Sequence, residues 1–321
     1  MRVRDYWLAG SAVAGSVALW MLLRRTGPAQ PRTHILDLEP SPESPGPENG
    51  SVQFIGTATT LIRFGNLTIL TDPNFLHRGD RIHLGYGRHA TRLTDPEREF
   101  EALPQIDFVL LSNLHEEHFD KLVERRLDPH TPILTTASAA RTLARRGFLN
   151  TYALRTWDRV NVRKGPVSLR VTALPARHAA RPFSAAMPDV MGSMLEFRHD
   201  PDGRHYSIYI SGDTLIFRDL YEIPRRHPRV DLALLHLGGA RVLGALASMD
   251  AAQGIQALRI IRPEIAIPIH YNDYDIFEEP VEEFLREAER EGWRDRVRYL
   301  RHGETCSFAS SGTPLEARPL V

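Results

Sequence analysis

Short apolar runs separated by turn residues recur along the chain after residue 50. The first three lie close together, with Gly65 and Asn66 between the second and the third and Asp72-Pro73 after the last. Runs of this length between turn residues predict strands, and their close spacing predicts a meander. We expect strands at residues 52–55, 60–64, 67–70, 108–111, 133–136, 167–173, 206–211, 232–235 and 265–269.

Three other segments repeat their apolar positions with the period of a helix. In the last of them Val281, Phe284, Leu285 and Ala288 fall on one face, and Gly292 follows the segment. Strands interspersed with such segments predict an α/β sheet architecture. We expect helices at residues 139–146, 251–262 and 281–291.

Residues 6–23 carry no charged side chain, and arginines flank them on both sides. At ~1.5 Å per residue a helix of this length spans ~27 Å, close to the ~30 Å hydrocarbon layer. We expect a single-pass membrane anchor at residues 1–25 and hence a membrane location. A cleaved secretory signal is the alternative, which the two arginines directly after the apolar run disfavour. Arginines on both flanks leave the orientation open.

Residues 26–50 are rich in Pro, Ser and Glu, a composition that buries little apolar surface. We interpret them as an extended linker. The third unit, a folded body, is expected over residues 51–321.

The composition narrows the classes of partner. The 321 residues contain 40 Lys+Arg and 40 Asp+Glu, so no basic field exists to attract nucleic acid, and no nucleic-acid partner is expected. Cys306 is the only cysteine, which excludes an intramolecular disulfide and a zinc cage built from cysteines. Fourteen histidines direct attention to other metal ligands.

Metal-competent side chains follow several of the predicted strands. The strand at 108–111 runs into a loop that carries His115 and His118, and other strands lead to His178, Asp213 and His270. Two histidines three residues apart also occur at the solvated start of a helix. Further His and Asp residues at separate strand ends favour a metal centre instead, because imidazole and carboxylate groups ligate zinc and neighbouring divalent metals.

Together these residues resemble the metallo-β-lactamase superfamily, within it the branch of N-acyl-phosphatidylethanolamine phospholipase D-like and lactonase-like hydrolases. The resemblance covers about residues 51–308 and rests on residues 54–60, 70–73 and 268–271. It implies a four-layer αββα sandwich with metals at the upper edge of two sheets. It also implies one or two zinc ions, with another divalent metal as the alternative.

The resemblance also implies a set of ligands. The first metal would take His115, His178 and Asp213, with Asn113 where the family has a third imidazole. The second would take His118, His270 and Asp213, with Glu117 in place of a shorter Asp. An amide oxygen is a weaker donor to zinc than imidazole, so a single tightly bound metal is the alternative.

Asp213 and Glu117 are the catalytic candidates that follow from this set. Asp213 would bridge the metals and orient a metal-bound hydroxide, the nucleophile of the implied reaction. Asp72, Asp120 and His236 are candidates to hold the ligands in place from behind. Capping a helix is the alternative role for Asp120, and a substrate contact is the alternative for His236.

Two loops could border the metal cleft and contact a substrate. Phe75 and Tyr86 follow Asp72 along the chain, and Arg181 follows His178. Apolar side chains beside a cation suit an acyl chain next to an anionic group. Ordinary loop packing is the alternative.

The leading hypothesis is a membrane-anchored, metal-dependent hydrolase of a phosphodiester or ester, acting on a small molecule or a phospholipid-like substrate. A lactonase is the alternative within enzymes. A binding protein with a degraded metal site is the alternative outside them, because Asn113 and Glu117 depart from the family motif.

Overall fold

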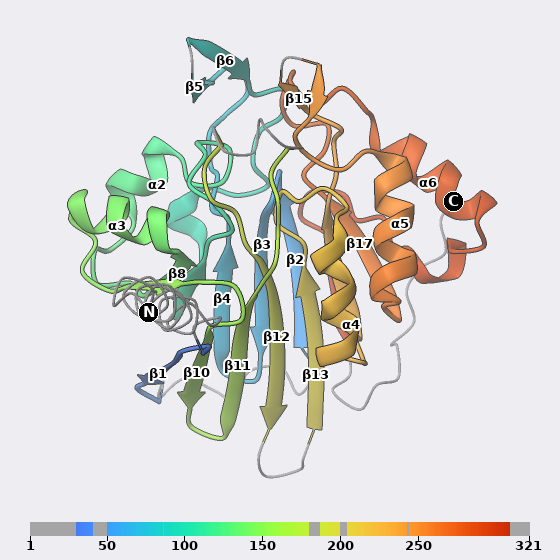
Figure 1. Ribbon diagram of the computed structural model, residues 1–321. Coiled ribbons are helices and arrows are strands. Elements are labelled where there is room, and N and C mark those ends of the chain that lie inside the picture. Colours follow the sequence, from blue (N-terminus) through green and yellow to red (C-terminus); the bar gives the residue numbers. More distant parts are fainter. Residues whose placement is uncertain are drawn as a thin grey trace, which may run out of the picture. The chain divides into compact units, whose positions relative to one another are not determined.

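A computed structural model describes residues 30–40, 50–85, 87–179, 187–199, 204–242 and 244–308. Two seven-stranded sheets pack face to face in it (Figure 1). The first sheet contains, in order, β1 (Thr33–Leu38), β10 (Arg159–Lys164), β11 (Val167–Leu174), β12 (Gly192–His199), β13 (Arg204–Ile210), β14 (Leu232–His236) and β17 (Ile265–Ile269). The second contains β18 (Thr305–Phe308), β2 (Gly50–Gly56), β3 (Thr59–Phe64), β4 (Leu67–Thr71), β7 (Phe108–Leu110), β8 (Ile133–Thr136) and β9 (Thr151–Leu154).

Helices cover the outer face of each sheet (Figure 1). The helices are α2 (Lys121–Arg126) and α3 (Ala137–Arg145) over the second sheet, and α4 (Ile223–Arg226), α5 (Ala251–Ile261) and α6 (Val281–Arg290) over the first. Short 3-10 turns span Phe100–Ala102, Arg218–Glu222 and Arg294–Arg296, and two hairpins pair β5 (Arg81–Gly85) with β6 (Arg88–Thr91) and β15 (Arg241–Val242) with β16 (Ala245–Leu246). The layers are therefore helix, sheet, sheet, helix, as the resemblance implied.

The central strands are buried on both faces. In β14, Leu232 and Leu234 pack into the core between the sheets, whereas Ala233 and Leu235 pack against the helices. A strand that meets protein on both sides needs apolar residues at every position. This is why such strands stand out in the sequence as continuous apolar runs.

The predicted linker at residues 26–50 is partly wrong. Thr33–Leu38 form β1, which pairs in parallel with β10 at the edge of the first sheet. Leu36 is buried in the core between the sheets. The Pro- and Glu-rich composition that suggested a tether is concentrated after this strand, so the folded body begins at Thr33 rather than at Ser51.

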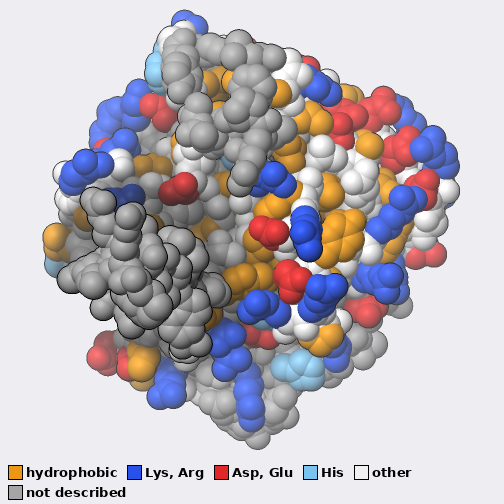
Figure 2. Space-filling model, in the orientation of Figure 1, with side chains coloured by type: hydrophobic (Ala, Val, Ile, Leu, Met, Phe, Trp, Pro, Cys, Tyr) orange, Lys and Arg blue, Asp and Glu red, His pale blue; other side chains and the backbone are white. Residues whose placement is uncertain are grey.

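The predicted anchor at residues 1–25 lies outside the described residues. Within the ranges that the structure describes, no helix is long and apolar enough to span a membrane. On the face shown in Figure 2, Lys and Arg side chains are interspersed with Asp and Glu. On α6, Arg286 forms an ion pair with Glu283, and Arg290 forms one with Glu287.

Candidate metal centre

The polar residues meet because the strands that carry them run parallel. β4 and β7 are parallel neighbours in one sheet, and β13, β14 and β17 are parallel neighbours in the other. The carboxyl ends of parallel strands share one edge of a sheet, where α/β proteins place their sites. Residues at or just after these ends, and after β11, are Asp72, the loop 112–118, His178, Asp213, His236 and His270.

One group of potential ligands consists of His115, His178 and Asp213, here called the first cluster. One ligand atom from each lies within 4.8 Å of the others. Nε2 of His178 is 3.3 Å from Nδ1 of His115 and 4.0 Å from Oδ2 of Asp213. These are the residues that the resemblance implied for the first metal.

The second cluster consists of His118, Asp213 and His270, again within 4.8 Å of one another. Oδ2 of Asp213 accepts a hydrogen bond from Nε2 of His118 at 2.8 Å, and its Oδ1 lies 3.5 Å from Nε2 of His270. Asp213 thus belongs to both clusters, with one oxygen turned toward each histidine of the second.

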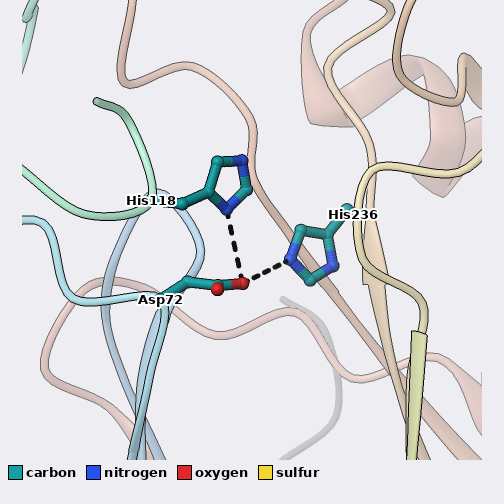
Figure 3. Close-up of side chains that lie close together, drawn as sticks. All are labelled: Asp72, His118 and His236. Carbon is teal, nitrogen blue, oxygen red and sulfur yellow. Dashed lines mark hydrogen bonds and ion pairs between the residues drawn. The ribbon is translucent and has the colours of Figure 1, made fainter. Parts of the chain in front are cut away.

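A third group consists of Asp72, His118 and His236 (Figure 3) and shares His118 with the second cluster. Oδ2 of Asp72 is 3.3 Å from Nδ1 of His118 and 3.3 Å from Nε2 of His236, and its Oδ1 accepts a hydrogen bond from the N–H of Ser112. Both oxygens are already engaged by protein donors. Asp72 therefore holds His118 in one orientation, and His236 in turn holds Asp72.

The first two clusters differ from the third because they leave buried atoms unpaired. Oδ1 of Asp213, Nε2 of His270 and Oε2 of Glu117 are buried and have no hydrogen-bond partner. An unpaired buried polar atom costs about 1–3 kcal/mol, so several at one point need an explanation. A divalent cation accepts lone pairs from Asp213 and His270, and the donor set of imidazole and carboxylate fits zinc or a related metal.

Two ligand imidazoles are oriented by the backbone. Nδ1 of His178 donates to the carbonyl of Ala247 at 2.6 Å, and Nδ1 of His270 donates to the carbonyl of Leu237 at 3.2 Å. A hydrogen on Nδ1 leaves the lone pair on Nε2. Both rings therefore present a metal-binding nitrogen to Asp213.

The hydrogen bonds of Asn113 give it a positioning role, and its role as a metal ligand stays a prediction. Its Oδ1 accepts from the N–H of His115 at 2.9 Å, and its Nδ2 lies 3.4 Å from Oδ2 of Asp213. A backbone N–H can only donate, so the amide oxygen must face it and the NH₂ group must face the carboxylate. Asn113 therefore positions Asp213 and shapes the ligand loop.

Glu117 lies beside the first cluster. Its Oε1 is 3.5 Å from Nδ1 of His115, whereas the resemblance placed it with the second metal. Burial raises the pKa of its carboxyl group, because a charge is costly away from water. A buried carboxyl group with one free oxygen can carry a proton as well as bind a metal.

The remaining candidates are placed elsewhere. Asp120 caps α2, since Oδ1 accepts from the N–H groups of Leu122 and Val123. Its Oδ2 accepts from the N–H of Phe75, and the Phe75 ring is fully buried in the core against the second sheet. Phe75 therefore cannot contact a substrate, and the cap is the observed role of Asp120. Tyr86 and Arg181 lie outside the described residues.

Several residues at the metal centre have a strained backbone conformation. Four non-glycine residues here have positive φ, a conformation that costs about 1–3 kcal/mol each. They are Thr57 at 51°, Asp72 at 36°, Ala179 at 70° and His270 at 63°. Hydrogen bonds hold three of them, since the carbonyl of Thr57 accepts the N–H of His270 and the carbonyl of Asp72 accepts the hydroxyl of Thr59.

Sequence reasoning missed Arg92, a fully buried cation beneath the centre. Its Nη1 donates to Oγ1 of Thr57 at 2.7 Å and to the side-chain oxygen of Asn74, and its Nε donates to the carbonyl of Thr94. Asn74 in turn donates to the carbonyl of Glu116 in the ligand loop. Arg92 therefore ties the loop that holds His115 and His118 to the segment that supports His270.

His118 is the histidine of the two clusters whose pKa is raised. Burial alone would lower its pKa, but the carboxylates of Asp213 and Asp72 outweigh burial and raise the pKa well above 6.5. For Asp72, burial would raise the pKa, yet the charge of His118 lowers it to about 2. In the metal-free protein His118 is an imidazolium ion between two carboxylates.

The other imidazoles of the two clusters stay neutral. Burial lowers the pKa of His115 and of His270 to about 4, and it also lowers the pKa of His178. Near pH 7 these rings therefore need to lose no proton before they bind a metal.

Metal binding should consequently release at least about one proton per protein at pH 7, the proton on Nε2 of His118. Calorimetric titration of the metal-free protein with Zn²⁺ in two buffers of different ionisation enthalpy measures this number. The affinity should fall about tenfold per pH unit on acidification, because one proton competes with the metal. The variant His227→Gln, which alters a histidine paired with Glu196 outside the centre, should release the same number. Heats that do not depend on the buffer would contradict the protonation assigned to His118.

Comparison with known proteins places the chain in a family. The beta-lactamase superfamily domain matches residues 68–271, a span that contains all members of the three groups. The chain belongs to the beta-lactamase superfamily. Within the superfamily, it is 27% identical over 259 residues to a UPF0173 metal-dependent hydrolase of Staphylococcus aureus (strain MRSA252), covering 80% of this chain and 99% of the relative. It is 29% identical over 212 residues to a UPF0173 metal-dependent hydrolase of Archaeoglobus fulgidus, covering 63% and 82%.

A solved structure shares the superfamily fold. The isothiocyanate hydrolase from Delia radicum gut bacteria superposes with a TM-score of 0.69 at 19% identity, over 80% of this chain and 99% of that one. Superfamily membership and the hydrolases that resemble it make this protein a metal-dependent hydrolase with the metallo-β-lactamase fold.

Proposed function

We propose that the protein is a two-metal hydrolase that cleaves an ester or phosphodiester bond. One observation carries the proposal: Asp213 belongs to both clusters, and its Oδ1 is buried without a hydrogen-bond partner. A carboxylate in this position suits two cations side by side. Zinc or a related metal bound there supplies a nucleophile near neutral pH by lowering the pKa of water to about 7.

Each side chain of the centre then has a separate role. His115 and His178 hold one side of the centre, and His118 and His270 hold the other. Asp213 joins the two sides and orients the nucleophile. Glu117 delivers a proton from its free Oε2 to the leaving oxygen, which suits a buried carboxyl group whose pKa is raised.

This arrangement favours an enzyme over a binding protein with a degraded site. The two departures from the family motif, Asn113 and Glu117, leave both clusters with three potential ligands each. A phospholipid-like substrate is the form of the proposal that a membrane anchor at residues 1–25 would favour. A lactone, as a cyclic ester, needs the same nucleophile and is the second candidate substrate.

Metal analysis and a substrate screen test the proposal. The purified protein should hold about two divalent ions and hydrolyse bis(4-nitrophenyl) phosphate, 4-nitrophenyl acetate or γ-butyrolactone only while they are bound. His270→Ala should keep about one ion and lose at least about a hundredfold in kcat, whereas His227→Ala should change neither. Absence of metal from the folded protein, or hydrolysis that chelators leave unchanged, would refute the proposal.

A further inference from the structure

A cavity of about 370 Å³ adjoins the metal centre on the side of His178. His178 is a member of the first cluster and also part of the cavity wall. Met191, on the same wall, donates its N–H to the carbonyl of Ser112 in the ligand loop. The cavity therefore opens beside the reacting centre rather than at a remote place.

Segments at the ends of β8, β9 and β11 and a segment before β12 form the wall. Thr136 and Ala137 come from the end of β8 and the start of α3, Leu154 ends β9, and Arg155 and Thr156 follow it. Ala176, Arg177 and His178 follow β11, and Asp189, Val190 and Met191 precede β12. Apolar and polar groups are mixed, which is typical of a site that orients a small molecule.

Arg177 is the best-placed charge in this wall. Its guanidinium lies over the ring of Phe217, 4.3 Å from the ring centre. Within the part of the chain that the structure describes, no carboxylate pairs with it. Stacking fixes the plane of a guanidinium and leaves its edge, where the N–H groups are, available for an anion.

The other two charges are less available or of the wrong sign. Nε of Arg155 lies 3.4 Å from Oδ2 of Asp158, which shares its charge. Asp189 is exposed to solvent, so water screens its carboxylate. The fixed cation that remains beside the centre is Arg177.

We propose that Arg177 binds a carboxylate or phosphate group of the substrate inside this cavity, next to the bond that is cleaved. The inference rests on the proposed function and specifies its substrate as a small ester or phosphodiester with a second anionic group. A guanidinium binds both kinds of anion through two parallel hydrogen bonds. A volume at the lower end of the ~300–1,000 Å³ range of ligand sites fits a small molecule.

Two esters with the same leaving group test the proposal in the metal-loaded full chain. Mono-4-nitrophenyl succinate carries the second anion, and 4-nitrophenyl acetate does not. Arg177→Met should raise KM for the succinate ester at least about tenfold and leave kcat/KM for the acetate ester within about twofold. Arg177→Lys should restore part of the loss. Arg286→Met, on α6, should change neither kinetic constant. Asp189→Asn should not raise KM for the succinate ester.

Calorimetric titration with succinate supplies a measurement that does not depend on turnover. The wild-type protein should bind succinate at least about tenfold more tightly than Arg177→Met. Equal binding by both proteins, equal losses for the two esters, or a larger loss in Asp189→Asn would overturn the assignment of Arg177 while leaving a metal-dependent hydrolase. A protein without metal would instead refute the proposed function itself.

Discussion

Replacing Asp213 by asparagine should lower kcat/KM by at least about a thousandfold, which corresponds to about 4 kcal/mol of transition-state stabilisation. Asparagine keeps the shape of the side chain but removes the charge that both clusters share. It also removes the carboxylate that meets Nε2 of His118 at 2.8 Å. Metal content should therefore fall together with activity, as elemental analysis of the purified variant would show.

A buried carboxylate elsewhere in the same sheet provides the control. Asp231 is buried just before β14 and accepts hydrogen bonds from Ser207 and from Nε of Arg229. Asp231→Asn should keep the metal and the activity. Full metal content and turnover in Asp213→Asn would show that the two clusters are not the reacting centre.

Replacing Arg92 by methionine should cost about 3 kcal/mol or more of unfolding free energy. Two effects oppose each other, since methionine avoids the cost of burying a cation but leaves acceptors without donors. The hydroxyl of Thr57 and the carbonyl of Thr94 lose this donor, and Oδ1 of Asn74 keeps only the hydroxyl of Tyr274 as a donor. Removing one partner from a buried polar network usually outweighs the gain.

Urea unfolding of the metal-free variant measures this loss, and metal analysis tests the link to the centre. We expect weaker metal binding, because Arg92 connects Asn74 and the ligand loop to the segment that holds His270. Arg141→Met, at an exposed position of α3, is the control and should change stability by less than about 0.5 kcal/mol. A change below about 1 kcal/mol in Arg92→Met would contradict the role of the network.

Several of the strands that the sequence predicted are buried on both faces, but β12, in the middle of the first sheet, was not predicted. Continuous apolar runs marked β7, β14 and β17, and the expected helices lie within two residues of α3, α5 and α6. β1 and β10 lie at one edge of the first sheet and carry polar residues such as Asp37 and Arg163, so no apolar run announced them. β1 also lies next to the Pro-rich segment, so the composition of this region predicted a linker and not a strand.

The site shows the same division between what local pattern encodes and what tertiary contacts decide. Histidines and aspartates at strand ends could be recognised, because parallel strands bring such positions together. The role of Asn113 depends on which way the N–H of His115 points. The burial of Phe75 depends on its packing near α2, more than 40 residues later in the chain. Arg92 carried no sequence signal, since one arginine in an arginine-rich chain looks like surface charge.

The backbone carbonyls that orient His178 and His270 also bear on how the protein can diverge. A carbonyl group remains whatever side chain its residue carries, so substitutions at Leu237 or Ala247 that keep the chain path leave both tautomers in place. The surrounding loops can then change freely without disturbing two of the imidazoles. Mutations in the loops can therefore change the substrate while the metal-binding nitrogens of His178 and His270 keep their positions.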